Sequence, residues 1–363
     1  MRSRRVPRWV SLSQEIPAAH DCRPALQARW EQKSTTERAM MMKAAQIFSY
    51  GAPDVLTVGE VERPEPGPGQ VLVGVAASSV NGHDALVRSG AMKIVSGRRF
   101  PIGVGLDFAG FVAAVGTGVD SVRPGEPVWG TVHPREKHAV AGAAEFVVVA
   151  ADRVAPMPDG MSAVRAAALV VPGITALAAL RGATHLQAGE SVLVRGAAGG
   201  VGTAAVQLAH ALGGRVTALA RTRHTSALTD LGAERVLDYR ETTPDDAGTF
   251  DVIVDTVGTD LARYRRRLTK GGRMVTVGLS GPAIAAIAAS AVFGSRRIRT
   301  FSADPRTAQL TELTELVTAG AIVPVIDGVY PLTDITAAHR AFDRGGAVGR
   351  QMVQISEIGS TDR

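Results

Sequence analysis

The hydrophobic pattern of the chain changes twice along its length. From about 43 to 162, short apolar runs are separated by glycine and proline clusters, which is typical of an irregular antiparallel β domain. From about 163 to 320, apolar strands alternate with helix-length segments, which predicts a parallel sheet covered by helices on both faces. Residues 321–357 return to proline-bounded strands and one short helix near 335–342. This last segment therefore completes the first domain, and the α/β domain is inserted into it.

The expected elements follow from these runs. Strands of the first domain are expected at 43–48, 71–75, 108–112, 128–132 and 145–149. Strands of the second domain are expected at 191–195, 216–220, 236–238, 252–255, 274–278 and 298–302. We assign 41–162 and 321–363 to the first domain and 163–320 to the second.

A glycine-rich turn follows the first strand of the α/β segment. The run 192–194 is apolar and predicts a buried parallel strand, while the spacing of apolar residues over 203–209 predicts a helix. Glycines between the two let the backbone approach a pyrophosphate, and the helix N-terminus offers unpaired N–H groups to it. The sequence therefore predicts a dinucleotide-binding turn, although glycine turns in α/β proteins also serve packing alone.

The next strand ends about 20 residues after the glycines, where such sites meet the adenosine ribose. An acidic residue there favours NAD, but this chain has Arg221 and Arg223, followed by His224, and no carboxylate before Asp230. A guanidinium suits a 2′-phosphate, so NADPH is expected as the cofactor. The alternative is that both arginines are ordinary solvated charges.

Charge is unevenly distributed along the chain. The net charge is +6, of which residues 1–40 supply +4 through eight Lys or Arg and four acidic residues. The rest carries no basic stripe with interleaved aromatics, so no nucleic-acid partner is expected. Residues 1–40 lack an apolar core, and their acids argue against a transit peptide. We interpret them as a disordered tail or a start-site artefact, with the fold beginning near Met41.

Membrane insertion is not expected either. The apolar segment 282–293 is much shorter than the roughly 20 residues that a membrane span needs. We therefore expect a cytoplasmic protein with no membrane partner.

Several motifs occur together in one order. They are Pro66–Val73, Ser79–Asn81, Gly105–Gly110, Pro172–Ala176, Ala198–Gly202, Asp255–Gly258 and Gly271–Gly278. Over 42–357 the chain resembles the medium-chain dehydrogenases/reductases, in particular their zinc-independent quinone oxidoreductase (zeta-crystallin-like) branch. The resemblance implies an α/β fold in which a doubly wound Rossmann sheet is inserted into a GroES-like irregular β domain. It also implies a homodimer formed edge to edge near Arg299–Ser302.

The resemblance bears directly on zinc. Zinc-bearing alcohol dehydrogenase relatives place a cysteine ligand at Asn81 and read Gly-His-Glu at Gly105–Asp107, and the only cysteine here is Cys22. Three histidines lie in no recognised ligand spacing and are expected in loops: His83, His133 and His138. We expect no metal, and without a Lewis acid alcohol oxidation is disfavoured.

The remaining chemistry is hydride transfer to an acceptor that is electrophilic unaided, a quinone or an alkene conjugated to a carbonyl. By resemblance, Asn81 lies at the pocket between the domains, where its amide could donate to the developing oxyanion. The alternative is an asparagine that satisfies a turn. Asp84 is expected to orient the loop or cap the next helix rather than transfer protons. Water is the expected proton source.

The resemblance also implies the residues that contact the cofactor. They are Thr175, which would open a helix near the nicotinamide phosphate, the turn Ala198, Gly199, Gly200, Val201 and Gly202, then Arg221, Arg223 and Tyr239 at the adenosine half, Val257, Gly258, Gly278 and Leu279 beside the nicotinamide, and Arg350. For Arg350 the alternative is a solvated basic residue.

Two departures separate the chain from the family pattern. Many relatives read Asp-Thr-Tyr where this chain has Asp84-Ala85-Leu86, so an aromatic pocket residue is missing. The loop 91–100 is long, and its apolar residues either form a lid or pack on their own domain: Met92, Ile94 and Phe100.

Two alternatives to a quinone or enone reductase remain. One is a non-catalytic NADPH-binding regulatory protein. The other is an enoyl-thioester reductase, whose phosphopantetheine groove could draw on Arg98, Arg99 and Arg135.

Overall fold

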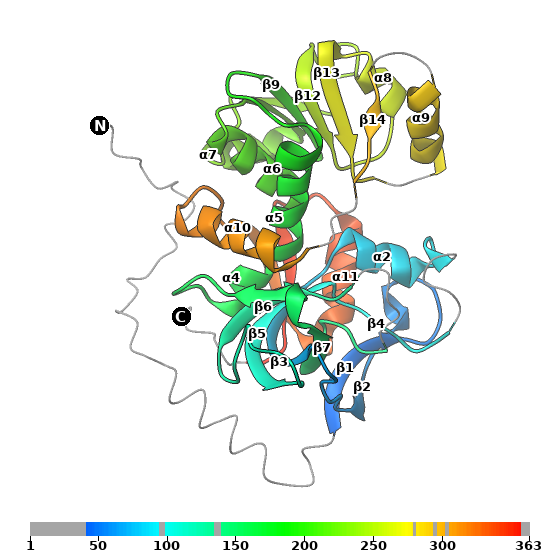
Figure 1. The fold of residues 1–363 in the computed structure, drawn as a ribbon. Coiled ribbons are helices and arrows are strands. Elements are labelled where there is room, and N and C mark those ends of the chain that lie inside the picture. The colour runs from blue at the N-terminus through cyan, green and yellow to red at the C-terminus, as the bar shows by residue number, and fades with distance from the viewer. Residues whose placement is uncertain are drawn as a thin grey trace.

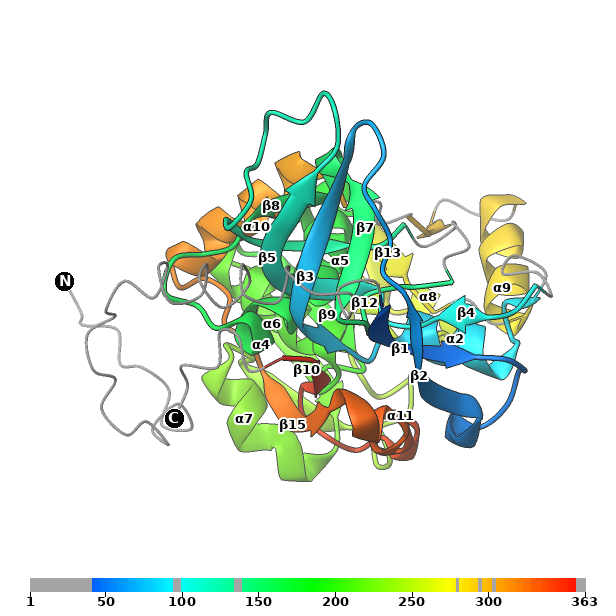
Figure 2. The same ribbon diagram turned by 90° about the horizontal axis from the view of Figure 1, so that it is seen from below.

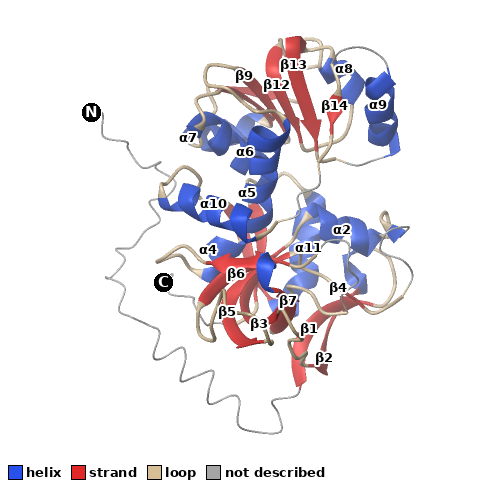
Figure 3. Cartoon of the chain, viewed as in Figure 1, coloured by secondary structure: helices blue, strands red, loops and turns tan. Residues whose placement is uncertain are grey.

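The computed structural model describes residues 41–93, 99–133, 139–278, 281–292, 296–301 and 305–356. They form two lobes, which lie one above the other in Figure 1. The lower lobe is built around antiparallel strands, and the upper lobe alternates strands with helices, as the colours of Figure 3 show. One hydrophobic core cluster includes both Trp129 of the lower lobe and Val194 of the upper lobe, so the two lobes pack against each other.

The lower lobe holds two sheets. The smaller has the order β2-β1-β4, and the larger has the order β15-β16-β3-β5-β6-β8, with β7 also paired to β3. Their strands are β1 (Met41–Ile47), β2 (Leu56–Glu62), β3 (Gln70–Ser79), β4 (Ile102–Gly103), β5 (Asp107–Val115), β6 (Pro127–Thr131), β7 (Phe146–Ala150), β8 (Val154–Pro156), β15 (Ile326–Pro331) and β16 (Arg350–Gln354). Because β16 pairs antiparallel with β3, the C-terminal segment returns to the first sheet.

Helices pack on this lobe through narrow apolar faces. In α11 (Ile335–Arg344), the buried side chains Ile335, Ala338 and His339 recur at helical spacing. Ile335 and Ala338 join a core cluster that includes Val353 of β16, and His339 lies against Arg88. Figure 2 shows α11 beside β15 at the lower edge of the molecule. The other elements are α2 (Gly82–Ser89), α4 (Ala163–Ala167) and the 3₁₀ turns η3 (Pro53–Val55), η4 (Ala151–Arg153) and η7 (Leu332–Asp334).

The upper lobe contains a six-stranded parallel sheet with the order β11-β10-β9-β12-β13-β14. Its strands are β9 (Ser191–Arg195), β10 (Arg215–Ala220), β11 (Arg235–Asp238), β12 (Phe250–Asp255), β13 (Leu268–Thr276) and β14 (Ile298–Arg299). Its helices are α5 (Val170–Leu177), the π segment η5 (Ala178–Ala183), α6 (Gly200–Ala211), the 3₁₀ turn η6 (Thr222–His224), α7 (Thr225–Asp230), α8 (Leu261–Arg265), α9 (Gly281–Val292) and α10 (Thr307–Thr318). The strand order reverses between β9 and β12, which is where doubly wound sheets bind ligands.

The predicted fold class is confirmed. Val192, Leu193 and Val194 are fully buried in the centre of the parallel sheet, which explains why their run is continuously apolar. The expected strand 274–278 ends earlier, at Thr276, because the chain turns there to bring Gly278 against Gly258. Of the expected strand 298–302, Ile298 and Arg299 pair with β13, and Ser302 lies outside the described residues.

One helical stretch of the described chain, Ala163–Ala183, is long and apolar enough to cross a membrane by length and composition. However, 78% of its most apolar window is buried inside the protein. Its hydrophobicity is therefore explained by packing between the lobes. The segment at 282–293 forms α9, whose apolar part spans only Pro282–Ala291.

Candidate functional site

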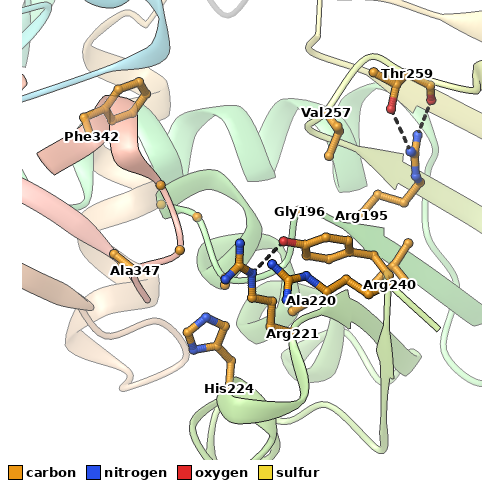
Figure 4. Close-up of a pocket in the computed structure, with 18 of the residues that line it drawn as sticks. Arg195, Gly196, Ala220, Arg221, His224, Arg240, Val257, Thr259, Phe342 and Ala347 are labelled. Carbon is orange, nitrogen blue, oxygen red and sulfur yellow. Dashed lines mark hydrogen bonds between the residues drawn. The ribbon is translucent and has the colours of Figure 1, made fainter. Parts of the chain in front are cut away.

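A cavity of about 790 Å³ lies where the two lobes meet. Its upper wall comes from the loops that follow β9, β10, β11 and β12, so it sits at the carboxyl edge of the parallel sheet. Its lower wall comes from Val80, the end of α11 and the segment 345–351, and Figure 4 shows part of both walls. Both its size and its place at the switch point suit a bound cofactor.

The glycine turn forms one wall of the cavity. A Cβ on Gly202 would lie 2.2 Å from the Gly196 carbonyl oxygen, so this glycine permits α6 to start tightly against β9. A Cβ on Gly200 would lie 2.3 Å from Cδ of Arg350, so this glycine admits the arginine side chain. A Cβ on Gly199 would meet no atom nearer than 3.6 Å, so there is free space beside this residue, although its N–H donates to the Gly196 carbonyl over 3.1 Å. Ala198, Gly199 and Gly200 line the cavity, whereas Val201 and Gly202 serve the helix behind it.

Arg221 points into the cavity, as Figure 4 shows, at the end where the adenosine half of the cofactor is expected. Its Nε donates to the Tyr239 hydroxyl over 2.7 Å, which lowers the pKa of that phenol. The nearby Asp238 carboxylate instead accepts the Thr222 N–H and hydroxyl, each at 2.7 Å, and these bonds lower its pKa to about 2. No described carboxylate pairs with Arg221, so its charge is open to a ligand.

Arg223 does not share this position. Its Nη2 donates to the Gly346 carbonyl, which belongs to the lower lobe, and its Nε donates to Nε2 of His224 over 3.3 Å. Arg223 is absent from the cavity lining, whereas His224 is part of it. Of the two arginines predicted to face the ribose phosphate, only Arg221 lines the cavity, because Arg223 donates to a backbone carbonyl of the lower lobe.

Arg350 is buried, with 6% of its surface exposed. Its Nη2 donates to Asp107 Oδ2 over 3.0 Å, to Asn81 Oδ1 over 2.9 Å and to the Ser79 hydroxyl. Burial raises the pKa of the Asp107 carboxyl, and the guanidinium of Arg350 and the Ser79 hydroxyl oppose that rise. Burial also lowers the pKa of Arg350. The alternative of a solvated basic residue is wrong.

Asn81 and Asp84 begin α2 rather than line the cavity. The Asp84 carboxylate accepts the Asn81 N–H over 2.8 Å and the Gly105 N–H over 3.2 Å, so it fixes the start of the helix, as expected. Asn81 is 2% exposed, its Oδ1 accepts from Arg350, and its Nδ2 is 3.4 Å from the Ser79 carbonyl oxygen. The expected donation from Asn81 to a substrate oxygen is thus not found, because both amide groups face the protein interior.

The loop after β12 forms the cavity wall beside the expected nicotinamide. Asp255 accepts the Gly258 N–H over 2.8 Å and the Thr276 hydroxyl over 2.7 Å, and its other oxygen pairs with Arg195. Val257, which follows Asp255 in this loop, is 49% exposed and lines the cavity. The Gly258 and Gly278 backbones touch, since a Cβ on Gly278 would lie 2.6 Å from Gly258. Leu279 lies outside the described residues.

Sequence reasoning missed Arg195 as a site residue. Its guanidinium donates to the Thr259 carbonyl oxygen over 2.8 Å, a bond drawn in Figure 4, and lies 3.7 Å from the centre of the Tyr264 ring. A charged residue at the end of a buried strand was the available signal, because the carboxyl end of such a strand opens into the ligand crevice. Arg240, which also lines the cavity, follows β11 in the same way.

The structure corrects the expectation for Thr175. This residue lies inside α5 instead of opening a helix, is 7% exposed, and its hydroxyl donates to the Val171 carbonyl over 2.7 Å. Thr175 is absent from the cavity lining. The helix begins earlier, at Val170, because the apolar residues before Thr175 are buried as one helical stretch between the lobes.

The long loop at 91–100 is described only at its ends. Phe100 packs edge-to-face on Tyr50 with ring centres 5.0 Å apart, and Met92 packs against the same core cluster. Phe100 and Met92 therefore pack on their own lobe, which is the second of the two interpretations given for this loop, and do not form a lid. Ile94, Arg98 and Arg135 lie outside the described residues.

These walls fit a pyridine dinucleotide. One cavity is lined by the free space beside Gly199, by Arg221, which has no carboxylate partner among the described residues, and by Val257. Nε of Arg350 is buried against Gly200 and has no hydrogen-bond partner in the described chain. A buried unsatisfied donor costs about 1–3 kcal/mol, so an acceptor such as a phosphate oxygen would stabilise it.

Comparisons with known proteins agree with this geometry. The alcohol dehydrogenase GroES-like domain family matches residues 67–159, and the zinc-binding dehydrogenase family matches residues 231–353. The pig (Sus scrofa) quinone oxidoreductase is 33% identical over 330 residues, covering 86% of this chain and 98% of the relative. The chain belongs to the quinone oxidoreductase branch of the medium-chain dehydrogenases/reductases.

Solved structures of this family superpose well on the chain. The quinone oxidoreductase from Coxiella burnetii has a TM-score of 0.79 at 29% identity, covering 87% of this chain and all of that one. A mycobacterial protein solved in complex with NADPH has a TM-score of 0.73 at 26% identity, covering 86% of this chain and all of that one. The protein is therefore an oxidoreductase of a pyridine-nucleotide-binding family.

Proposed function

We propose that this protein transfers a hydride from NADPH to a quinone or an α,β-unsaturated carbonyl. The observation that carries the proposal is the open charge of Arg221 at the adenosine end of a dinucleotide-sized cavity. A planar guanidinium recognises a phosphate by two parallel hydrogen bonds, and NADH has no phosphate at that position.

We further propose that the reaction needs no zinc. Zinc-bearing relatives place a cysteine ligand at Asn81 and read Gly-His-Glu at Gly105–Asp107, so that the histidine of this motif falls at Leu106. Here Asn81 and Asp107 both accept hydrogen bonds from Arg350 instead. The guanidinium of Arg350 thus supplies the positive charge that compensates the buried Asp107 carboxylate. Within the described ranges, no group of three or more His, Cys, Asp or Glu residues is arranged to hold a metal ion.

The bound nicotinamide would supply the hydride. The chain's own contribution is to bind, orient and exclude water: Gly199 and Arg350 face the pyrophosphate, Arg221 the 2′-phosphate, and Val257 the nicotinamide ring. Apolar Val80 and Phe342 line the opposite wall and keep water from the reacting centre.

The proton that completes the reduction comes from water in this proposal. Asp84 is only three residues from Asn81, which was expected beside the acceptor. However, both oxygens of the Asp84 carboxylate accept backbone N–H groups. A carboxylate held in this way stabilises the fold of its loop and does not serve as a general acid.

The activity is tested by following steady-state NADPH oxidation against a panel of quinones, enones and enoyl-thioesters. Turnover of quinones or enones supports the proposal. Turnover of enoyl-thioesters alone would make the protein a thioester reductase instead. Tight NADPH binding without turnover of any acceptor would favour a regulatory protein.

We also propose that the protein forms a homodimer through β14. This strand is at the edge of the parallel sheet, and exposed edges invite pairing with another chain. Sedimentation equilibrium decides between one and two copies.

A further inference from the structure

One residue at the adenosine end of the cavity has no role in the proposed function. His224 ends the 3₁₀ turn η6, is 8% exposed, and lines the cavity beside Arg221. Figure 4 shows its imidazole between Arg221 and the Ala347 segment of the lower lobe. The protonation state of a nearly buried histidine on the wall of an anion site depends on whether an anion is bound there.

The free protein keeps this imidazole neutral. Its Nε2 accepts from Nε of Arg223 over 3.3 Å, which requires an unprotonated ring nitrogen. Burial, then Arg223, then Arg221 lower the pKa of His224.

Groups on the facing elements act in the other direction. The Gly346 carbonyl raises the pKa of His224, and so does the Asp327 carboxylate on β15. However, Asp327 is exposed and accepts from Nε2 of Gln351 over 2.7 Å, so it is engaged elsewhere. The two arginines and burial therefore prevail.

A phosphomonoester reverses this balance. It brings about two negative charges at neutral pH to a cluster in which the cations Arg221 and Arg223 outweigh the exposed Asp327 carboxylate. An anion in contact with the arginines cancels their repulsion and adds its own attraction for a protonated ring.

We propose that His224 takes up a proton when the 2′-phosphate of NADPH binds beside Arg221, and so becomes an additional cation that distinguishes NADPH from NADH. The inference rests on the proposed use of NADPH. It assigns to the site a pH-dependent preference that Arg221 alone would not produce, since an arginine keeps its charge at every physiological pH.

The proposal predicts the direction in which NADPH affinity changes with pH. Above about pH 7, where the phosphate is fully ionised, NADPH affinity should fall as pH rises, by up to tenfold per unit for one linked proton. NADH affinity should stay level over the same range, because no phosphate recharges the imidazole.

The experiment is titration calorimetry of the wild-type protein with NADPH and with NADH near pH 7, in buffers of different ionisation enthalpy. The buffer dependence gives the number of protons taken up. We expect greater uptake with NADPH than with NADH, and loss of that difference in His224→Gln. The matched control is His210→Gln, an exposed histidine at the end of α6 outside the cavity lining, which should behave as wild type.

Equal proton uptake with the two nucleotides in the wild type would overturn the inference, whatever the stability of the variants. Unchanged uptake in a folded His224→Gln protein would overturn it as well. Failure of the wild type to bind NADPH at all would instead refute the proposed function.

Discussion

Arg350 and Arg221 both line the cavity, and the two arginines are held in opposite ways. Arg350 is enclosed by Asp107, Asn81 and Ser79, so its charge is compensated inside the protein. Among the described residues Arg221 donates to the Tyr239 hydroxyl and has no carboxylate partner, so its charge remains available. The same residue type therefore ties β16 to β3 and β5 of the lower lobe at one place and is available to an anion at the other. The difference lies in the carboxylate, which is present at the first place and absent at the second.

The largest effect is expected when Asp107, the carboxylate that compensates the buried charge of Arg350, is removed. Asp107→Asn would leave the Arg350 guanidinium buried without a counter-charge, and we expect the free energy of unfolding to fall by about 3–5 kcal/mol. Urea denaturation followed by circular dichroism measures this loss. The double variant Asp107→Asn/Arg350→Met should recover part of it, because neither charge is then buried alone.

A loss as large in the double variant as in Asp107→Asn would show that the pair is not the cause. The buried hydroxyl of Ser79 would then be the group to examine, because it donates to Asp107 Oδ1 over 2.6 Å.

A second buried arginine lies between α2 and α11. Its contact with a histidine predicts that the stability of the fold depends on pH. The Arg88 guanidinium lies 3.3 Å from Nδ1 of His339, which is 1% exposed, and burial lowers the pKa of His339 to about 4. Between pH 6.5 and 4 the unfolded chain takes up a proton that the folded protein does not. Stability is therefore complete above pH 6.5 and falls with decreasing pH, by about 3 kcal/mol at most.

Urea midpoints measured at several pH values test this expectation. His339→Gln keeps an oxygen acceptor for Arg88 but cannot titrate, so its stability should depend less on pH in this window. An identical pH profile in the two proteins would contradict the assignment.

At the open end, Arg221→Ala should weaken NADPH binding by about 2 kcal/mol, or roughly thirtyfold, because a hydrogen bond to a charged group is lost. NADH binding should change much less. Tyr239→Phe is the matched control, since it removes the acceptor of Arg221 without removing the charge, and its effect should be smaller. Fluorescence titration with both nucleotides gives the affinities. Equal losses for the two nucleotides in Arg221→Ala would mean that the arginine does not contact the 2′-phosphate.

The sequence predicted the parts of this site that depend on the backbone. The glycine turn and the residue after β10 follow from strand periodicity, because a parallel strand fixes where its carboxyl end opens. Arg221 was found in this way. Arg223 and Asn81 were placed less well, since their partners Gly346 and Arg350 lie more than one hundred residues away in sequence. Spacing along the chain contains no information about which lobe's carbonyl or guanidinium will meet a side chain.

The smallest expected effect concerns metal. If Arg350 supplies the positive charge beside Asp107, then exhaustive treatment with a chelator should leave NADPH oxidation unchanged. Elemental analysis of the treated and untreated protein makes the result interpretable, because unchanged activity matters only when any zinc has been removed. Loss of activity that added zinc restores would mean that a metal acts in the reaction. The comparison between the two arginines would then need revision, since Arg350 would be sharing Asp107 with a second cation rather than replacing one.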